Sequence, residues 1–140
     1  MPHEFFSQGW AEAWGEAIRS NEAYREAGRA WESPMILLSA ADPDLGIPER
    51  AVYADLHQGG CREARAATAE DLESCPYILA ADIRTWKRVL DGELEPIPGL
   101  MRGKLKLRRG NLAALLPHVA GSKQLVLSAT RVETLFPEGL

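Results

Sequence analysis

Three residues in the middle of the chain have the side-chain types of a nucleophilic catalytic set. Asp55, His57 and Cys61 offer an acid, a base and a thiol, and a turn at 58–60 could bring the thiol back toward the other two. Such a set could hydrolyse a bound acyl thioester. However, Asp55 and His57 share a side only as any i, i+2 pair of a strand does, and no neighbouring group supplies an oxyanion site. We therefore keep an acyl-thioester hydrolase as an alternative and expect that the protein is not an enzyme.

The metal-binding residue types are too dispersed for a metal centre. Neither a His-x-x-x-His nor a Cys-x-x-Cys motif occurs, and the three histidines are widely separated, at His3, His57 and His118. Two cysteines are too few for a disulfide scaffold, so we interpret Cys61 and Cys75 as reduced thiols. We expect neither a bound metal nor a cofactor.

A glycine-containing segment with a lysine also fails as a phosphate-binding loop. That motif requires four residues between its glycines and a Ser or Thr after the lysine. Here three residues separate Gly99 from Gly103, and Leu105 follows Lys104. Nucleotide phosphates are therefore not expected ligands.

Length and composition are those of an ordinary globular domain. At 140 residues, of which 46% are apolar and 26% charged, the chain predicts a single domain over 1–140. No apolar run approaches the ~20 residues of a membrane span. The first ten residues lack the features of a secretory signal, which predicts a cytoplasmic location. The net charge of −4 does not favour binding to the phosphates of nucleic acid, so we expect no nucleic-acid partner.

The N-terminal half predicts helices followed by a meander of strands. Apolar residues recur at helical spacing over 7–32, with an interruption at Ser20–Asn21, where either residue could cap a second helix. The apolar run 35–41 is too short for a globular helix and predicts a central strand. Residues 51–57 alternate between apolar and polar, and the glycines after them predict that 61–67 returns antiparallel.

The C-terminal half alternates short strands with helices. Residues 76–81 predict a fourth strand, and Trp86 lies in an amphipathic helix that a glycine ends. A short turn then leads to 104–108, whose alternation predicts a fifth strand with one buried face. Helical spacing over 112–119, and again near 121–130, completes an α+β fold.

The segment from Thr85 to Val119 closely resembles the end of the lipid-binding domain of the sterol carrier protein-2 family. The family signature has a helix, a Gly-Lys/Glu-Leu/Met-x-Pro segment, and then Gly-Lys-Leu-Lys-hydrophobic before Gly-Asn or Gly-Asp. The matching residues are Gly92, Glu93, Leu94 and Pro96, the run 103–107, and Gly110 with Asn111. Two arginines, Arg108 and Arg109, precede Gly110 where many members have one residue, which predicts a bulge or a longer loop.

The resemblance implies a five-stranded, mostly antiparallel sheet covered by helices, with an apolar tunnel between them. It implies noncatalytic binding and intracellular transfer of sterol-like lipids, fatty acids or fatty acyl-CoA, so the expected partner is a long-chain lipid or fatty acyl ligand. The helix near the C-terminus resembles the one that covers the lipid site in this family. The residues expected to line the tunnel come from the matching elements and are Trp86, Leu90, Leu100, Met101, Leu105, Leu112, Leu115, Leu116 and Val126.

Two further expectations concern the interior. Trp10, Trp14 and Trp31 lie at helical spacing and are interpreted as core residues, whereas the resemblance places Trp86 beside the tunnel. An empty tunnel of ~400 Å³ would cost ~10 kcal/mol, comparable with the whole stability of a domain. We therefore expect that the unliganded protein closes around flexible residues such as Met101, or that it retains lipid or water.

A second hypothesis is a protein-interaction module of the same fold that binds no lipid. Such a module would use an apolar surface to dimerise or to dock on an enzyme. The basic residues of 104–109 could contact an anionic membrane, although the outward face of a half-buried strand is expected to be charged in any case. A homodimer and a transient membrane contact therefore stay open as partners.

Overall fold

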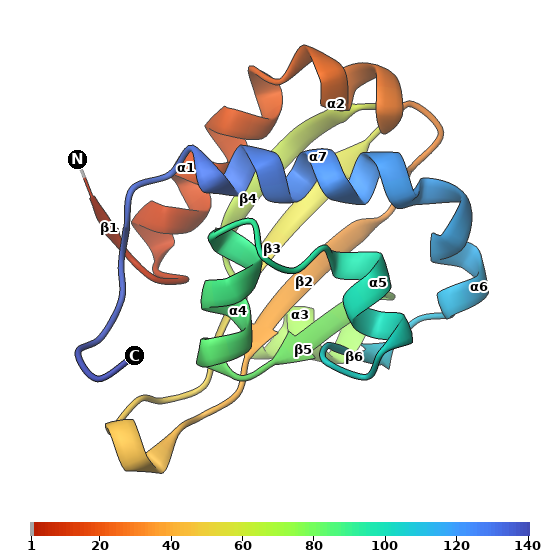
Figure 1. Ribbon diagram of the computed structural model, residues 1–140. Coiled ribbons are helices and arrows are strands. Elements are labelled where there is room, and N and C mark those ends of the chain that lie inside the picture. Colours follow the sequence, from red (N-terminus) through yellow and green to blue (C-terminus); the bar gives the residue numbers. More distant parts are fainter. Residues whose placement is uncertain (1) are drawn as a thin grey trace.

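The computed structural model describes residues 2–140, which form a five-stranded sheet with helices on both faces (Figure 1). The strands of the sheet are β2 (Pro34–Ser39), β3 (Arg50–His57), β4 (Gly60–Ala66), β5 (Ile78–Ala81) and β6 (Lys106–Arg109). Their order is β4-β3-β2-β5-β6, in which β2 and β5 are parallel and the other neighbours are antiparallel. This confirms the predicted α+β class, the mostly antiparallel sheet and the central position of the strand near 35–41.

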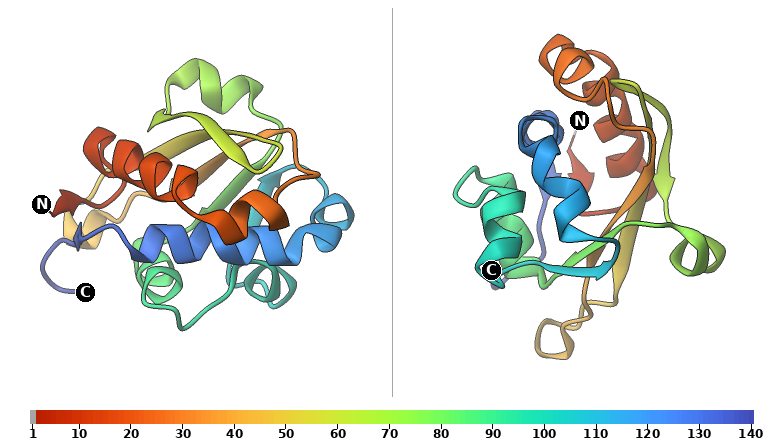
Figure 2. Two further views of the ribbon diagram at one scale, coloured as in Figure 1. Left: turned by 90° about the horizontal axis from the view of Figure 1, so that it is seen from above. Right: turned by 90° about the vertical axis from the view of Figure 1, so that its right-hand side faces the viewer.

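The helices are divided unequally between the two faces of the sheet. They are α1 (Gln8–Arg19), α2 (Glu22–Ala27), α3 (Ala69–Ser74), α4 (Ile83–Leu90), α5 (Pro96–Met101), α6 (Leu112–Leu115) and α7 (Val119–Thr130), with 3-10 turns at Pro43–Leu45 and Leu116–His118. Figure 2 shows α3 alone on one face and the longer helices gathered on the other. Among residues 2–140, no helix has both the length and the apolar content needed to cross a bilayer.

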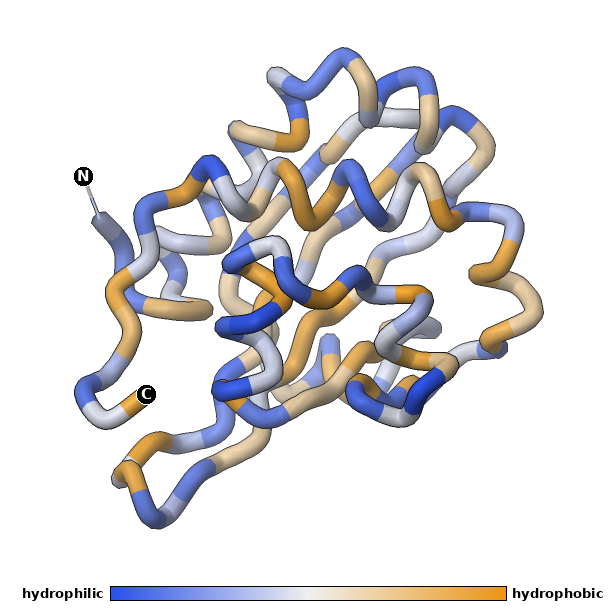
Figure 3. Tube along the Cα trace, viewed as in Figure 1, coloured by the Kyte–Doolittle hydropathy of each residue, from blue (hydrophilic) through white to orange (hydrophobic). Residues whose placement is uncertain are grey.

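Two short segments near the ends of the chain lie side by side. β1 (His3–Glu4) pairs in parallel with β7 (Thr134–Leu135), apart from the main sheet. Apolar positions run along β2 and β5 at the centre of the main sheet (Figure 3). The largest buried cluster lies between this sheet and the longer helices.

Capping residues define the break between α1 and α2. Ser7 Oγ accepts a hydrogen bond from the backbone N–H of Trp10 at 3.2 Å, which begins α1. Asn21 Oδ1 accepts one from the N–H of Tyr24 at 3.1 Å, which begins α2. Asn21 is one of the two residues predicted as the cap.

The β3–β4 hairpin follows the predicted alternation. Val52, Ala54 and Leu56 are fully buried on one face of β3. At the turn Gly59 has a φ of 84°, and a Cβ there would lie 2.1 Å from the backbone oxygen of Arg25. The turn therefore needs glycine both for its conformation and for its contact with the end of α2.

The short turn expected through Leu100 and Met101 is instead helix α5. Pro96 occupies its first turn, where the missing N–H costs nothing and the fixed φ favours a helix. After the helix, the N–H of Lys104 donates to the carbonyl of Gly99 at 2.8 Å. This turn delays the next strand, so β6 begins at residue 106 rather than at 104.

The two arginines before Gly110 form a bulge. Leu79 pairs with Leu107 and Ile78 pairs with Arg109. Arg108, between them, has no partner residue on β5, which defines the bulge. This confirms one of the two outcomes predicted for this segment. Further along, the helix expected over 112–119 is divided into α6 and a 3-10 turn because Pro117 removes an intrahelical donor.

Helix α3 covers part of the outer face of the sheet and was not predicted. Asp71 accepts from the backbone N–H of Thr68 at 2.8 Å while Thr68 Oγ1 accepts from the N–H of Asp71 at 3.1 Å, a reciprocal capping box. Asp71 also pairs with Arg65 of β4, which fixes α3 to the sheet. Leu72 packs on a small buried cluster formed by Ile36, Leu38, Cys75, Ile78 and Ala80.

Candidate functional site

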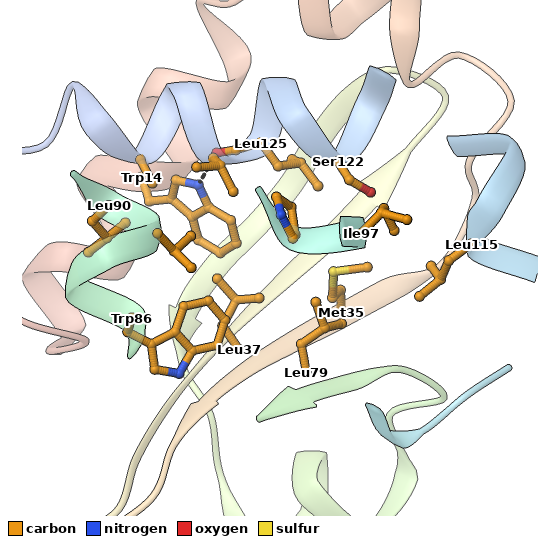
Figure 4. A pocket seen from close by; sticks show the side chains of 14 residues that line it. Trp14, Met35, Leu37, Leu79, Trp86, Leu90, Ile97, Leu115, Ser122 and Leu125 are labelled. Atoms are coloured by element: carbon orange, nitrogen blue, oxygen red, sulfur yellow. Dashed lines mark hydrogen bonds between the residues drawn. The ribbon is translucent and has the colours of Figure 1, made fainter. Parts of the chain in front are cut away.

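An apolar cavity lies between the sheet and the helices (Figure 4). Its volume is about 30 Å³, far below the ~300–1,000 Å³ of pockets that hold drug-sized ligands. Ser122 and the two tryptophans carry the polar side-chain groups among its lining residues, and the other lining side chains are apolar. The lining residues are Trp14, Met35, Leu37, Leu79, Trp86, Val89, Leu90, Pro96, Ile97, Leu115, Ser122, Leu125, Val126 and Ala129.

The floor of the cavity comes from neighbouring central strands. Met35 and Leu37 are two residues apart on β2, so they point to the same face of the sheet, and Leu79 pairs with Leu37 in the parallel register of β5. Ile36 and Leu38, at the alternate positions, belong to the cluster on the opposite face. The alternation of β2 therefore places one row of side chains against the helices and the other against α3.

Two tryptophans form walls of the cavity. Trp14 Nε1 donates to the backbone oxygen of Leu125 at 3.0 Å, and Trp86 Nε1 donates to that of Leu38 at 2.8 Å. Both buried N–H groups are thus satisfied, and the carbon surface of each ring is left for apolar contact. Trp14, which we expected in the core, is both a core residue and a lining residue.

A smaller cavity of about 10 Å³ lies beside the first, beneath the beginning of α7. Its own lining residues are Tyr24, Gly28, Trp31, His118 and Gly121. The residues that it shares with the larger cavity are Met35, Leu115, Ser122 and Leu125. These shared walls make the two cavities neighbours along one side of α7.

The combined cavity carries no fixed charge from the described residues. Among 2–140, no Lys, Arg, Asp or Glu lines either part. Burial, and to a smaller extent the proximity of Cys61, raises the pKa of Tyr24 to about 12, so its hydroxyl stays protonated at neutral pH. The site therefore offers apolar surface together with a few hydroxyl groups.

Four of the nine residues expected at the lipid site line the larger cavity, namely Trp86, Leu90, Leu115 and Val126. The five that lie outside both linings are Leu100, Met101, Leu105, Leu112 and Leu116. Met101 and Leu116 are 67% and 45% exposed, whereas Leu105 is buried against Gly99 of α5. Direct lipid contact by any of the nine stays a prediction.

Sequence reasoning missed the floor of the cavity. Met35, Leu37 and Leu79 lie in segments correctly predicted as strands but were not among the residues expected at the lipid site. The alternation within 35–41 could have singled out Met35 and Leu37 as one face. Which face carries the longer helices, however, depends on the path of the chain.

The residues of the catalytic alternative do not converge. Leu56 lies opposite Cys61 in the β3–β4 register and shares its buried cluster, so the thiol is on the core side while His57 points to the other face. Asp55 Oδ2 accepts a hydrogen bond from Arg62 Nε at 3.1 Å instead. Burial raises the pKa of the Cys61 thiol, which disfavours a nucleophilic thiolate. This geometry does not support acyl-thioester hydrolysis.

No metal site is found in the described part of the chain, residues 2–140, where no three His, Cys, Asp or Glu side chains are grouped to hold an ion.

Helix α7 is attached differently on its two sides. On the side of α1 and α2, two buried hydrogen bonds hold it. The backbone oxygen of Leu125 accepts one from Trp14 Nε1, and Ser128 Oγ accepts the other from Asn21 Nδ2 at 3.0 Å. Toward α5 it makes apolar contacts and an ion pair between Lys123 and Glu95, 3.8 Å apart and about half exposed. An exposed pair of this kind contributes ~0–1 kcal/mol, so the α5 side has the weaker polar attachment.

Comparisons with known proteins identify close relatives among solved structures. A scan of protein-family models and a search of curated proteins give no match. A crystal structure of a sterol carrier protein 2 is 39% identical to this chain, with a TM-score of 0.84, and the match covers 92% of this chain and 99% of that one. A conserved hypothetical protein from Thermus thermophilus, for which a sterol carrier role is suggested, is 37% identical, with a TM-score of 0.85 over 96% of this chain and 94% of its own.

A more distant structure shares the fold. The apo form of sterol carrier protein 2 from Yarrowia lipolytica is 13% identical, with a TM-score of 0.57 over 85% of this chain and 88% of its own. Sequence identity above a third over nearly the full length of a solved sterol carrier protein 2, together with the same fold, shows that this chain belongs to the sterol carrier protein 2 family.

Proposed function

We propose that this protein binds a long-chain lipid, without catalysis, between α7 and the sheet. The observation that carries the proposal is the charge-free apolar cavity at this position, in a member of the sterol carrier protein 2 family. Burial of the lipid chain would supply affinity at ~0.8 kcal/mol per CH₂ group. Sterol-like lipids, fatty acids and fatty acyl-CoA are the candidate ligands, and transfer between intracellular membranes is the candidate role.

The small volume of the cavity means that binding requires an opening movement. Lipid-sized sites occupy ~300–1,000 Å³, about ten times the present volume or more. At ~24 cal/mol per Å³, a 30 Å³ void costs ~0.7 kcal/mol, whereas a rigid 400 Å³ void would cost ~10 kcal/mol. A closed form is therefore the stable one without ligand, and the chain of the lipid fills the space as it forms.

The side of α7 that faces α5 is the proposed entrance. The two buried hydrogen bonds to Trp14 and Asn21 hold the opposite side of the helix. Separation along the α5 side breaks apolar contacts, which the lipid replaces, and an exposed ion pair of small energy. Less buried polar structure is lost there than on the α1 side.

The protein-interaction module remains the second candidate because the cavity is so small. Protein purified under native conditions should be extracted with organic solvent, and the extract should be analysed by mass spectrometry. We expect substoichiometric lipid, and saturable binding of a fluorescent fatty acid or a fluorescent sterol by the delipidated protein. If no lipid were extracted and neither probe bound, the interaction module would replace this proposal.

The noncatalytic part of the proposal has its own test. The protein should be incubated with a long-chain acyl-CoA, and free thiol should be measured over time. We expect no release above that of buffer. Release that is lost in Cys61→Ala would instead establish the hydrolase.

A further inference from the structure

The hydroxyl of Tyr24 is a buried hydrogen-bonding group without a partner within residues 2–140. Tyr24 is 1% exposed and sits in the first turn of α2, where its own N–H is bonded to the cap, Asn21. A buried hydroxyl of this kind is costly in the unliganded fold because it has lost its water without gaining a partner. Ser39 Oγ is also unpartnered within the same residues, but Ser39 lines neither cavity.

The hydroxyl end of the Tyr24 ring lies at the wall of the smaller cavity. A Cβ built on Gly28 would lie 2.5 Å from Cζ of Tyr24 and 2.9 Å from its hydroxyl oxygen. Gly28 and Tyr24 both line that cavity, which shares Met35, Leu115, Ser122 and Leu125 with the larger one. A ligand that fills both parts would thus have one end near Tyr24 and the rest of its length between Trp14 and Trp86.

The surroundings of Tyr24 select the chemistry of that end. Its hydroxyl remains a donor across the physiological pH range, since the ordinary tyrosine pKa of about 10 already lies above that range and burial raises it further. Within residues 2–140, no Lys or Arg lines the cavity. The other titratable lining residue is His118, whose ring packs edge-on against that of Trp31, with 4.9 Å between the ring centroids. A fully charged head group would be buried there without a counter-ion, which is strongly unfavourable.

Given the proposed lipid-binding function, we propose that the Tyr24 hydroxyl anchors the polar end of the ligand by donating a hydrogen bond to an uncharged oxygen, such as that of a hydroxyl or carbonyl group. Ser122, which lines both cavities, is close to the same end of the site. The apolar chain then extends toward Trp86. This orientation makes Tyr24 a specificity-determining residue that distinguishes lipids by their single polar group.

The test compares Tyr24→Phe with the unchanged protein, using pyrene probes that share one alkyl chain. The first probe ends in a hydroxyl group, the second in a methyl group and the third in a carboxylate. We expect the variant to bind the hydroxyl probe about five- to tenfold more weakly, because this factor corresponds to the loss of one net hydrogen bond. It should bind the methyl probe with unchanged affinity. The carboxylate probe should bind the unchanged protein more weakly than the hydroxyl probe does.

Tyr53→Phe is the matched control because Tyr53 lies on the outer face of the sheet, with Arg65 over its ring. It should bind all three probes as the unchanged protein does.

Tyr24→Phe removes an unpaired polar group, so its thermal unfolding midpoint should be at least that of the unchanged protein. A variant that bound the hydroxyl probe normally, or lost the hydroxyl and methyl probes equally, would overturn the inference.

Two other outcomes have separate meanings. Tighter binding of the carboxylate probe than of the hydroxyl probe would overturn the uncharged class of ligand. Failure of the unchanged protein to bind any of the three probes would refute the proposed lipid-binding function itself, and the assignment of Tyr24 with it.

Discussion

Gly28 links the stability of the fold to the shape of the candidate site. Its φ of −94° is open to any residue, but a Cβ there would lie 2.5 Å from the buried ring of Tyr24. The ring would have to shift against its packed neighbours, so we expect Gly28→Ala to destabilise the protein by ~1–3 kcal/mol. Urea denaturation would measure the loss.

Gly60→Ala is the control for that substitution. Among the described residues, the nearest atom to its added Cβ would be the backbone oxygen of His57, at 3.5 Å, an ordinary contact. We expect its free energy of unfolding to change by less than ~1 kcal/mol. Equal stability of the two variants would show that the Tyr24 ring can move aside, and that the smaller cavity is more adaptable than its packing indicates.

At the level of single residues, sequence reasoning located the site only in part. Trp86 and Leu115, which the family pattern placed at the lipid site, line the cavity, and their contact with lipid stays a prediction. Met101 was expected there too, but it ends a helix that the sequence did not reveal, and it points to solvent. The orientation of a side chain follows from the type of its element, so one unrecognised helical turn redirects several residues.

Among the elements, α3 depends on charge for its attachment to the sheet. The Arg65 guanidinium, followed by the capping contacts of Thr68, lowers the pKa of Asp71 to about 2, opposed in part by burial. Because the pKa of Asp71 is lower in the folded state, the ionised carboxylate stabilises the protein at every pH above its unfolded-state pKa near 4. This contribution is lost as the pH falls from about 4 to 2.

We therefore expect Asp71→Asn to lower the free energy of unfolding by ~1 kcal/mol at pH 7, a value reduced for solvent screening of a surface pair. The difference from the unchanged protein should shrink between pH 4 and pH 2. Urea denaturation of both proteins at several pH values would measure it. A difference that stayed constant down to pH 2 would assign the effect to packing rather than to charge.

Helix α7 is the element on which lipid entry depends. Val126 lines the cavity, whereas the next residue, Leu127, is 40% exposed and lies outside the lining. We expect Val126→Asp to lower the affinity for a fluorescent fatty acid at least tenfold, because it sets an unpaired carboxylate against the lipid chain. The unliganded stability should fall by no more than ~2 kcal/mol, since the half-buried side chain can turn toward solvent.

Leu127→Asp places the same charge on the same helix outside the cavity and should leave fatty-acid binding almost unchanged. Equal losses of affinity in both variants would indicate damage to α7 as a whole. If Val126→Asp failed to fold, α7 would belong to the permanent core, and the proposed entrance along α5 would be wrong.

The prediction of elements was correct where periodicity was long or alternation strict, as in 51–57 and the broken helix of 7–32. It missed α3 and α5, both of six residues. Helices this short carry little periodic signal and are stabilised by caps and tertiary contacts rather than by propensity. For α3 the sequence did contain a signal, the Thr68–Asp71 capping pair, whereas the prolines of α5 favoured a turn as readily as a helix.

At the scale of the whole molecule, the sheet and the helical layer have different mechanical roles. The sheet is tied together by backbone hydrogen bonds along each neighbouring pair of strands. The helices rest on it mainly through side-chain contacts, which can separate and re-form around a ligand. Ligand size should therefore change the spacing of the layers while the strand register stays the same.

This division predicts how lipids of different length stabilise the protein. At a hundredfold its dissociation constant, a ligand adds ~2.7 kcal/mol, which raises the unfolding midpoint of a domain of this size by roughly 8 °C. Octanoate and palmitate carry the same carboxyl group, so any difference between them reports burial of the chain. With about eight fewer CH₂ groups at ~0.8 kcal/mol each, octanoate should bind far more weakly and, at the same free concentration, give no measurable shift. Differential scanning calorimetry of the delipidated protein, with free ligand held below micelle formation, would measure both. Equal shifts from the two acids would mean that the cavity does not lengthen around its ligand, and that binding depends on the head group at a surface site instead.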